Sequence, residues 1–228
     1  MTPKRQTIII TGASKGLGKA ISESLLQSDF NLVLISRHMD YKMPLEQNDR
    51  LMAVSLDITD DKAVSSLMQS VVARFGSIDV LINNAGIFVN KNLDQSDNTT
   101  LDSIIDTNLK GLFYCTRAVI PFMKKQKSGL IVNVGSKITH KTNLDSGRTF
   151  YAASKYALEG FSLALQRELQ PWKIRVTALL PSTMQTFKSF SSRKFLALVD
   201  VAEIVKLIIR LRNVNFDSVI FQSVNQYL

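Results

Sequence analysis

The sequence predicts an α/β protein in which helices cover both faces of one parallel, doubly wound sheet. Short runs of aliphatic and β-branched residues alternate along the chain with longer segments whose apolar residues recur at helical spacing. The short runs lack polar alternation, which is typical of strands buried on both faces of a parallel sheet. Connections are short and no linker interrupts the pattern, so we expect a single domain over residues 1–228.

Seven short apolar runs are predicted to be strands because β-branched residues dominate them. The sixth run ends at Pro181, which lacks the N–H that a strand would need to continue. In chain order the predicted strands cover residues 7–11, 31–35, 51–56, 80–82, 130–134, 174–180 and 218–221.

Five segments are predicted to be helices. The first shows helical spacing in Leu17, Ile21 and Leu25. Residues 57–61, with the sequence Asp-Ile-Thr-Asp-Asp, supply capping side chains for the second. The third ends near Gly129 and the fourth is stopped by Pro171. The predicted helices cover residues 17–27, about 61–75, 101–123, 151–169 and 201–211.

Composition excludes several classes of protein. Of the 228 residues, 45% are hydrophobic and 21% charged, a balance that rules out disorder. The single cysteine, Cys115, permits no intramolecular disulfide, and with only two histidines we expect no metal site. No apolar run approaches the roughly 20 residues that span a bilayer. We therefore expect a cytoplasmic protein without a membrane partner.

The net charge of +9 raises the question of a polyanionic partner. Residues 1–100 hold 10 basic and 11 acidic side chains, whereas residues 101–228 hold 18 basic and 8 acidic ones. The excess therefore lies entirely in the second part. Its cations are scattered and not interleaved with exposed aromatic residues, so we expect no nucleic acid partner.

A glycine-rich turn, Gly12-Ala-Ser-Lys-Gly-Leu-Gly18, follows the first predicted strand. Gly12 allows a tight turn, Gly16 lets the backbone approach a pyrophosphate, and Gly18 allows close packing of helix on strand. The N–H groups and dipole at the start of the next helix favour phosphate. Residues Ser14, Lys15 and Leu17 belong to the same expected cofactor site.

The end of the second strand distinguishes the two nicotinamide cofactors. An acidic residue there binds the ribose 2′-OH of NAD. This chain has Ser36 and Arg37 instead, and Arg37 can clamp a 2′-phosphate with its planar guanidinium. Lys15 adds a second cation, so the sequence favours NADP over NAD.

Tyr151 and Lys155 stand four residues apart at the start of the fourth helix, on one face. A phenol has an ordinary pKa near 10 and is a poor acid at neutral pH, but a nearby ammonium lowers that pKa. Ser136 follows the fifth strand, where its hydroxyl can donate to a substrate carbonyl. We expect these three residues to form an acid–base site.

In order along the chain, the motifs are the glycine-rich turn, Asn83-Asn84-Ala85-Gly86, Asn108, Ser136 and the pair Tyr151 and Lys155. This set resembles the short-chain dehydrogenase/reductase family, from residue 7 to about residue 211. The resemblance implies a Rossmann fold and an oxidoreductase that transfers hydride between NADP and a carbonyl or alcohol.

The resemblance also implies roles for individual residues. Tyr151 would be the general acid–base, Lys155 would hold the nicotinamide ribose, and Ser136 would polarise the carbonyl. Asn108 would hold a water that connects Lys155 to solvent. The remaining implied cofactor contacts are Asp57 and Ile58 at the adenine, Asn84, Ala85 and Gly86 beside the ribose, and Met184 and Thr186 at the nicotinamide.

The chain departs from the family pattern in three places. Ser182 stands where a glycine is usual after Pro181, the interval from Ser136 to Tyr151 is about two residues longer, and residues 38–50 form a loop with Pro44 in place of a helix. The expected substrate loop, residues 182–199, is short and carries Lys188, Arg193 and Lys194. These cations are compatible with an anionic or carrier-linked substrate.

The leading hypothesis is an NADPH-dependent carbonyl reductase, with a 3-oxoacyl thioester as one possible substrate. A non-catalytic NADP-binding sensor of the same fold is the alternative, although a sensor would not need the acid–base residues. We expect a homodimer through the helices that contain residues 101–123 and 151–169, or a homotetramer.

Overall fold

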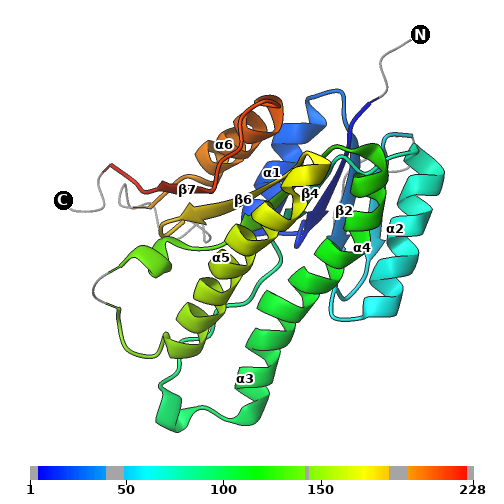
Figure 1. The fold of residues 1–228 in the computed structure, drawn as a ribbon. Coiled ribbons are helices and arrows are strands. Elements are labelled where there is room, and N and C mark those ends of the chain that lie inside the picture. Colours follow the sequence, from blue (N-terminus) through cyan, green and yellow to red (C-terminus); the bar gives the residue numbers. More distant parts are fainter. Residues whose placement is uncertain (1–4, 40–48, 142–143, 185–194, 225–228) are drawn as a thin grey trace.

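The computed structural model describes residues 5–39, 49–141, 144–184 and 195–224. It contains one parallel sheet of seven strands in the order β3-β2-β1-β4-β5-β6-β7, with helices on both faces (Figure 1). The predicted doubly wound α/β fold is confirmed. The strands are β1 (Thr7–Thr11), β2 (Asn31–Ser36), β3 (Leu51–Ser55), β4 (Val80–Asn83), β5 (Gly129–Val134), β6 (Ile174–Pro181) and β7 (Ser218–Phe221).

Two helical layers enclose the sheet. On one face lie α1 (Gly16–Leu26) and α6 (Leu198–Arg210), and on the other α2 (Asp61–Phe75), α4 (Gly111–Gln126) and α5 (Thr149–Leu169). The shorter α3 (Asn98–Ile105) precedes α4 and extends beyond the sheet (Figure 1). No helix in the described part of the chain is both long and apolar enough to cross a membrane.

Burial on both faces explains the continuous apolar strands. In β1, Ile8 and Ile10 face the layer of α1 and α6, whereas Ile9 faces the layer of α2, α4 and α5. All three side chains are completely buried. Because successive strand residues point to opposite faces, a central strand needs apolar residues at every position.

The second helix begins and ends where its capping residues predict. The Asp60 carboxylate accepts a hydrogen bond from the Ala63 N–H at 3.0 Å, and Gly76 adopts the left-handed conformation at the other end, with φ 79°. β1, α2 and β7 have their predicted bounds, and the other confirmed elements differ from theirs by one to three residues.

The long helix predicted over residues 101–123 is present, but a π-helical turn divides it. The helix begins three residues earlier at α3, behind the N-cap Asp97, and a π-helical turn, Asp106–Lys110, separates α3 from α4. After that turn, Gly111 packs so closely on Ile58 that a Cβ there would lie 2.6 Å from its side chain. The wider turn brings Asn108 into the interior, where its side chain has polar partners.

The arrangement of the strands positions the functional site. The chain leaves β1 toward one side of the sheet and β4 toward the other, so their carboxyl ends form the switch point where ligands bind in such sheets. The turns after β1, β2, β4 and β5 all open at this edge. The predicted motifs therefore meet there, although they are far apart in the sequence.

Candidate active site

The glycines after β1 have the geometry that a phosphate cradle requires. Gly12 has φ +65° and Gly16 has φ +55°, a region that residues with a side chain rarely adopt. A Cβ on Gly18 would lie 2.2 Å from the Gly12 carbonyl oxygen, so α1 packs directly on the turn. At Gly16 no heavy atom lies within 4 Å of the Cβ position, which leaves open space above the backbone.

The start of α1 is available to an anion. Lys15 occupies the N-cap position, but no side chain caps the helix, and its first turn contains no acidic residue. The first N–H groups of a helix need acceptors, and the dipole there favours negative charge. Together with the open space at Gly16, this arrangement fits the pyrophosphate of a dinucleotide.

A groove of about 270 Å³ runs from this turn along the carboxyl edge of the sheet. It brings together twelve of the residues expected to bind the cofactor: Gly12, Ser14, Lys15, Gly16, Leu17, Arg37, Asp57, Ile58, Asn84, Ala85, Gly86 and Met184. Gly18 does not line the groove but packs against the backbone of Gly12, which does. The groove is also lined by residues that the motifs did not indicate, namely Ile35, Ser36, Leu56, Ile87 and Thr107.

Hydrogen bonds hold the two main walls of the groove together. The Asn84 side-chain amide donates to the carbonyl oxygens of Thr11 and Gly12, at 3.0 and 3.2 Å. In return, the Thr11 hydroxyl accepts from the N–H groups of Asn84 and Ala85. The turns after β1 and β4 therefore form one rigid unit around the groove.

None of the described residues at the end of β2 and directly after it, from Ser36 to Met39, carries a carboxylate. Ser36 and Ser14 share a hydrogen bond of 2.8 Å, and Arg37 lies exposed at the rim of the groove. Asp57 is the one acidic residue among the described lining residues, and its carboxylate already accepts from the N–H and hydroxyl of Thr59. The positive character predicted for this end of the groove is therefore present.

Ser136, Tyr151 and Lys155 come together beyond the end of β5. The Lys155 ammonium lies 5.7 Å from the centre of the Tyr151 ring and donates to the Val134 carbonyl oxygen at 2.9 Å. Ser136 and Tyr151 both line a pocket of about 390 Å³. Met184 lines this pocket as well as the cofactor groove, so the two spaces are neighbours.

Burial governs the protonation of the acid–base pair. It lowers the pKa of Lys155, which is only 7% exposed, to about 8. It raises the pKa of the Tyr151 phenol, and the Ser136 hydroxyl and the charge of Arg148 oppose that rise. The expectation that a nearby ammonium lowers the Tyr151 pKa is not met, because desolvation outweighs the lowering by Ser136 and Arg148.

Asn108 is buried beside Lys155 and held on several sides. Its side chain accepts from the Ile87 N–H at 2.8 Å and donates to the Ile87 carbonyl oxygen and the Ser154 hydroxyl. The Asn108 carbonyl-type Oδ1 and the Lys155 Nζ lie 3.2 and 3.8 Å from the point where a Cβ of Gly86 would stand. A side chain at position 86 would therefore press on Asn108 at the place where Asn108 and Lys155 approach the groove.

Two pocket residues escaped the sequence motifs. The Phe88 ring packs edge-on against the Tyr151 ring at 4.9 Å, and the Arg148 guanidinium lies 5.9 Å from the centre of the Phe88 ring. Arg148 precedes Tyr151 by three residues and stands at the N-cap of α5. This position, three residues before Tyr151, was the signal in the sequence by which Arg148 could have been found.

The remaining residues considered in the sequence have other locations. Thr186, Lys188, Arg193 and Lys194 lie outside the described residues. His38 is exposed, and the His140 ring hydrogen-bonds to Glu159 at 2.9 Å. Cys115 is buried between helices, where desolvation raises its pKa to about 12, so it acts as an apolar residue.

The fold and the site define a dinucleotide-dependent oxidoreductase. The model of the short chain dehydrogenase family matches residues 6–195. The chain belongs to the short-chain dehydrogenase family. The 3-oxoacyl-[acyl-carrier-protein] reductase of Buchnera aphidicola is 36% identical over 190 residues, which are 82% of this chain and 76% of that protein.

Solved structures agree along almost the entire chain. The closed form of a serine dehydrogenase complexed with NADP+ has a TM-score of 0.90 and 27% identity, covering 98% of this chain and 97% of that one. The 3-ketoacyl-(acyl-carrier-protein) reductase from Brucella melitensis complexed with NADH has a TM-score of 0.85 and 25% identity, covering 97% and 98%. Similar proteins thus bind either nicotinamide cofactor.

Proposed function

We propose that the protein is an NADPH-dependent carbonyl reductase with a single catalytic domain. The proposal rests on the junction of two spaces at Met184. This residue lines both the groove after β1 and the pocket that contains Tyr151 and Ser136. A cofactor in the groove and a carbonyl in the pocket would meet at this junction. The proximity of two bound reactants is a large part of enzymatic rate enhancement.

The proposed mechanism assigns one task to each polar side chain. When bound, a reduced nicotinamide supplies the hydride. Tyr151 donates its phenolic proton to the carbonyl oxygen, and Ser136 donates a hydrogen bond to the same oxygen. Lys155 stabilises the phenolate that remains and binds the ribose hydroxyls of the cofactor.

Proton supply is the proposed task of Asn108. The Asn108 Oδ1 and the Lys155 Nζ face the same narrow space beside Gly86. We propose that a water held by Asn108 there passes protons from solvent through Lys155 to Tyr151. The fixed side chain of Asn108, with its bonds to Ile87 and Ser154, supports this positioning role.

The direct test is a panel of ketones, aldehydes and 3-oxoacyl thioesters, with NADPH consumption followed by absorbance. The thioester is included because the Buchnera relative is named a 3-oxoacyl-[acyl-carrier-protein] reductase. Turnover of any carbonyl compound supports a reductase. Tight NADPH binding without turnover across the panel would instead support the sensor of the same fold.

Arg37→Ala is expected to narrow the preference for NADPH over NADH by roughly tenfold to a hundredfold, because a charge-assisted bidentate contact with the 2′-phosphate is lost. Arg37 lies at the groove rim, and none of the described residues from Ser36 to Met39 carries a carboxylate that would favour NAD. Titration of both cofactors by fluorescence measures the ratio. Arg117→Ala is the control, because Arg117 pairs with Asp61 outside the groove. Equal affinities in the unmodified protein would contradict NADP specificity.

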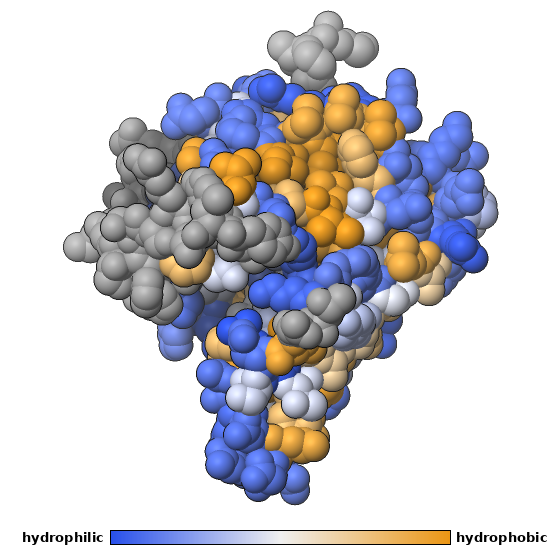
Figure 2. Space-filling model, turned by 90° about the vertical axis from the view of Figure 1, so that its left-hand side faces the viewer, coloured by the Kyte–Doolittle hydropathy of each residue, from blue (hydrophilic) through white to orange (hydrophobic). Residues whose placement is uncertain are grey.

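We also propose a homodimer through the outer face of α4 and α5. Phe113, which is 36% exposed, packs on Phe161 with ring centres 4.5 Å apart. An aromatic pair open to solvent is typical of the centre of an interface. A second apolar face is visible in Figure 2, on the side that carries α6 and β7, where Leu207 and Ile220 are 53% and 44% exposed.

Phe113→Asp is expected to convert the dimer to monomer, because a carboxylate buried between two copies has no partner. Sedimentation velocity over a range of concentrations measures the mass. Leu163→Asp is the control and should leave the dimer intact, because Leu163 is exposed on the side of α5 next to Asn215 and Asp217, away from the aromatic pair. A dimer that withstands Phe113→Asp but dissociates with Leu207→Asp would place the interface at α6 and β7 instead.

A further inference from the structure

The pocket beside Tyr151 is strongly cationic. Its charged lining residues are Lys137, Lys141 and Arg148, and no aspartate or glutamate occurs among the lining residues that the structure describes. The other lining side chains are neutral, and they include the Phe88 ring and the Tyr151 phenol. A pocket lined by one sign of charge concentrates ligands of the opposite sign.

Arg148 is the pocket cation nearest to Tyr151 along the chain. It stands at the N-cap of α5, where its carbonyl oxygen accepts from the Ala152 N–H at 2.8 Å. Tyr151 follows three residues later, in the first turn of the helix. Both side chains contact the same ring, that of Phe88. The Phe88 ring is therefore an apolar neighbour of both the guanidinium and the phenol.

The hydrogen-bonding capacity of Arg148 is not used up within the protein. Its Nη2 lies 2.7 Å from the carboxylate of Asp145, a side chain that is 71% exposed. Its Nε is buried and has no hydrogen-bond partner among the described residues. Exposed ion pairs contribute little to stability, so Asp145 can give way to another carboxylate. A buried donor without a partner is uncommon in native proteins, so Arg148 retains capacity to bind a further acceptor.

We propose that the substrate of the reductase is a compact oxo acid, whose carboxylate binds Arg148 while its carbonyl oxygen meets Tyr151. The inference rests on the proposed function and names the substrate class. The guanidinium fork matches the geometry of a carboxylate. Lys137 and Lys141 add positive charge around it.

The reaction leaves the carboxylate unchanged. The carbonyl carbon accepts a hydride, its oxygen accepts the Tyr151 proton, and the product is the corresponding hydroxy acid with an oxidised nicotinamide. Because Arg148 and Tyr151 both contact the Phe88 ring, the site favours acids in which only a few bonds separate the two groups. A carrier-linked thioester would present a neutral group to the guanidinium, so it fits this pocket less well.

The test compares oxo acids of three to six carbons with their methyl esters, measured as kcat/KM with NADPH. The unmodified protein is expected to prefer at least one acid over its ester by more than roughly tenfold, because a site built around a charged group rejects the analogue that lacks it. Arg148→Met should reduce that preference by roughly tenfold, mainly through KM, and Arg148→Lys should restore part of it.

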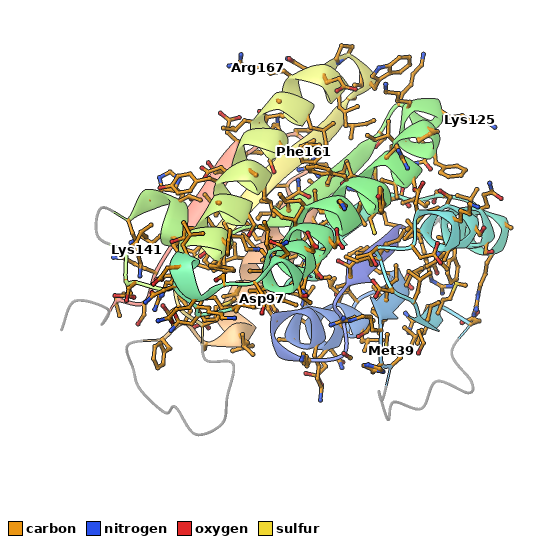
Figure 3. All side chains as sticks on the ribbon, turned by 90° about the horizontal axis from the view of Figure 1, so that it is seen from below. Met39, Asp97, Lys125, Lys141, Phe161 and Arg167 are labelled. Atoms are coloured by element: carbon orange, nitrogen blue, oxygen red, sulfur yellow. The ribbon has the colours of Figure 1, made fainter. Side chains whose placement is uncertain are left out.

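The control variant is Arg167→Met. Figure 3 shows Arg167 at the opposite end of α5 from Lys141, and its side chain is exposed. The substitution removes the same charge from the same helix, so it corrects for a change in overall charge. It should leave the ratio of acid to ester unchanged. Thermal melting of each variant shows whether the fold is retained.

Three results would overturn the inference. Equal kcat/KM for each acid and its ester in the unmodified protein, with neutral carbonyls reduced, would refute the oxo acid and leave the proposed function standing. An equal loss for acids and esters in Arg148→Met would show that Arg148 only supports Phe88 and Tyr151. A preference for 3-oxoacyl carrier thioesters that is insensitive to Arg148 would identify a carrier protein as the partner. Failure to reduce any carbonyl would refute the proposed function itself.

Discussion

Tyr151→Phe is expected to lower kcat/KM for carbonyl reduction about a thousandfold or more, the contribution typical of a positioned general acid. The substitution removes only the hydroxyl. The ring keeps its edge-on contact with Phe88 at 4.9 Å and its position 5.7 Å from the Lys155 ammonium. NADPH affinity should therefore change little. Steady-state rates and a fluorescence titration on the same sample measure the two effects separately.

Tyr156→Phe provides the matched control for that substitution. Tyr156 lies on the same helix but is 49% exposed and outside the pocket, so removing its hydroxyl should leave turnover unchanged. If Tyr151→Phe retained the rate of the unmodified enzyme, the proton would have to come from another group, with Ser136 the nearest hydroxyl in the pocket. A loss of rate accompanied by an equal loss of NADPH affinity would indicate a binding role for Tyr151.

Patterns among residues that are neighbours in the sequence were sufficient to predict the strands of the fold and the glycine-rich turn at the groove. Ile8, Ile9 and Ile10 predict a strand buried on both faces, because no other arrangement covers an unbroken apolar run of that length. Gly12 and Gly18 predict the turn, because backbone geometry and close packing there exclude a side chain. These features depend on neighbours in the sequence, so the sequence alone predicts them.

Features that depend on distant contacts were not predictable. The π-helical turn at Asp106–Lys110 reflects the partners of Asn108, Ile87 and Ser154, which come from different parts of the chain. The raised pKa of Tyr151 reflects burial by the assembled pocket, which a four-residue spacing does not reveal. The pairing of Phe88 with Arg148 depends on the meeting of two loops.

The site accounts for part of the positive net charge of the chain. Lys15 and Arg37 lie at the cofactor groove, in the part of the sequence with no net excess of charge. Lys137, Lys141 and Arg148 come from the basic second part and line the pocket. The described site therefore concentrates cations at two places, which fits small anions better than a nucleic acid that needs an extended basic surface.

Lys155→Met is expected to lower kcat/KM at pH 7 by roughly a hundredfold or more, because the ammonium that stabilises the Tyr151 phenolate is lost. The pH profile adds a second readout. With a pKa of about 8, Lys155 is charged below that pH and neutral above it. The kcat/KM for NADPH reports on the free enzyme, so it should be flat near neutrality and fall above about pH 8. That fall should be absent in Lys155→Met.

The same substitution should stabilise the fold. The Lys155 pKa is lowered from 10.5 to about 8, so between these values the unfolded chain binds more protons than the folded one, and the free energy of unfolding rises with pH across that window. Below pH 8 the cost of burying the charge is fully present. Lys155→Met removes this cost but also removes the hydrogen bond to Val134, and it should raise the free energy of unfolding at pH 7 by about 1–3 kcal/mol.

Urea unfolding at pH 7 and pH 10 measures the free energy of unfolding of both proteins. A variant that is less stable than the unmodified protein at pH 7 would show that Lys155 holds the fold together, whereas higher stability with lost activity would show that its buried charge is kept for catalysis.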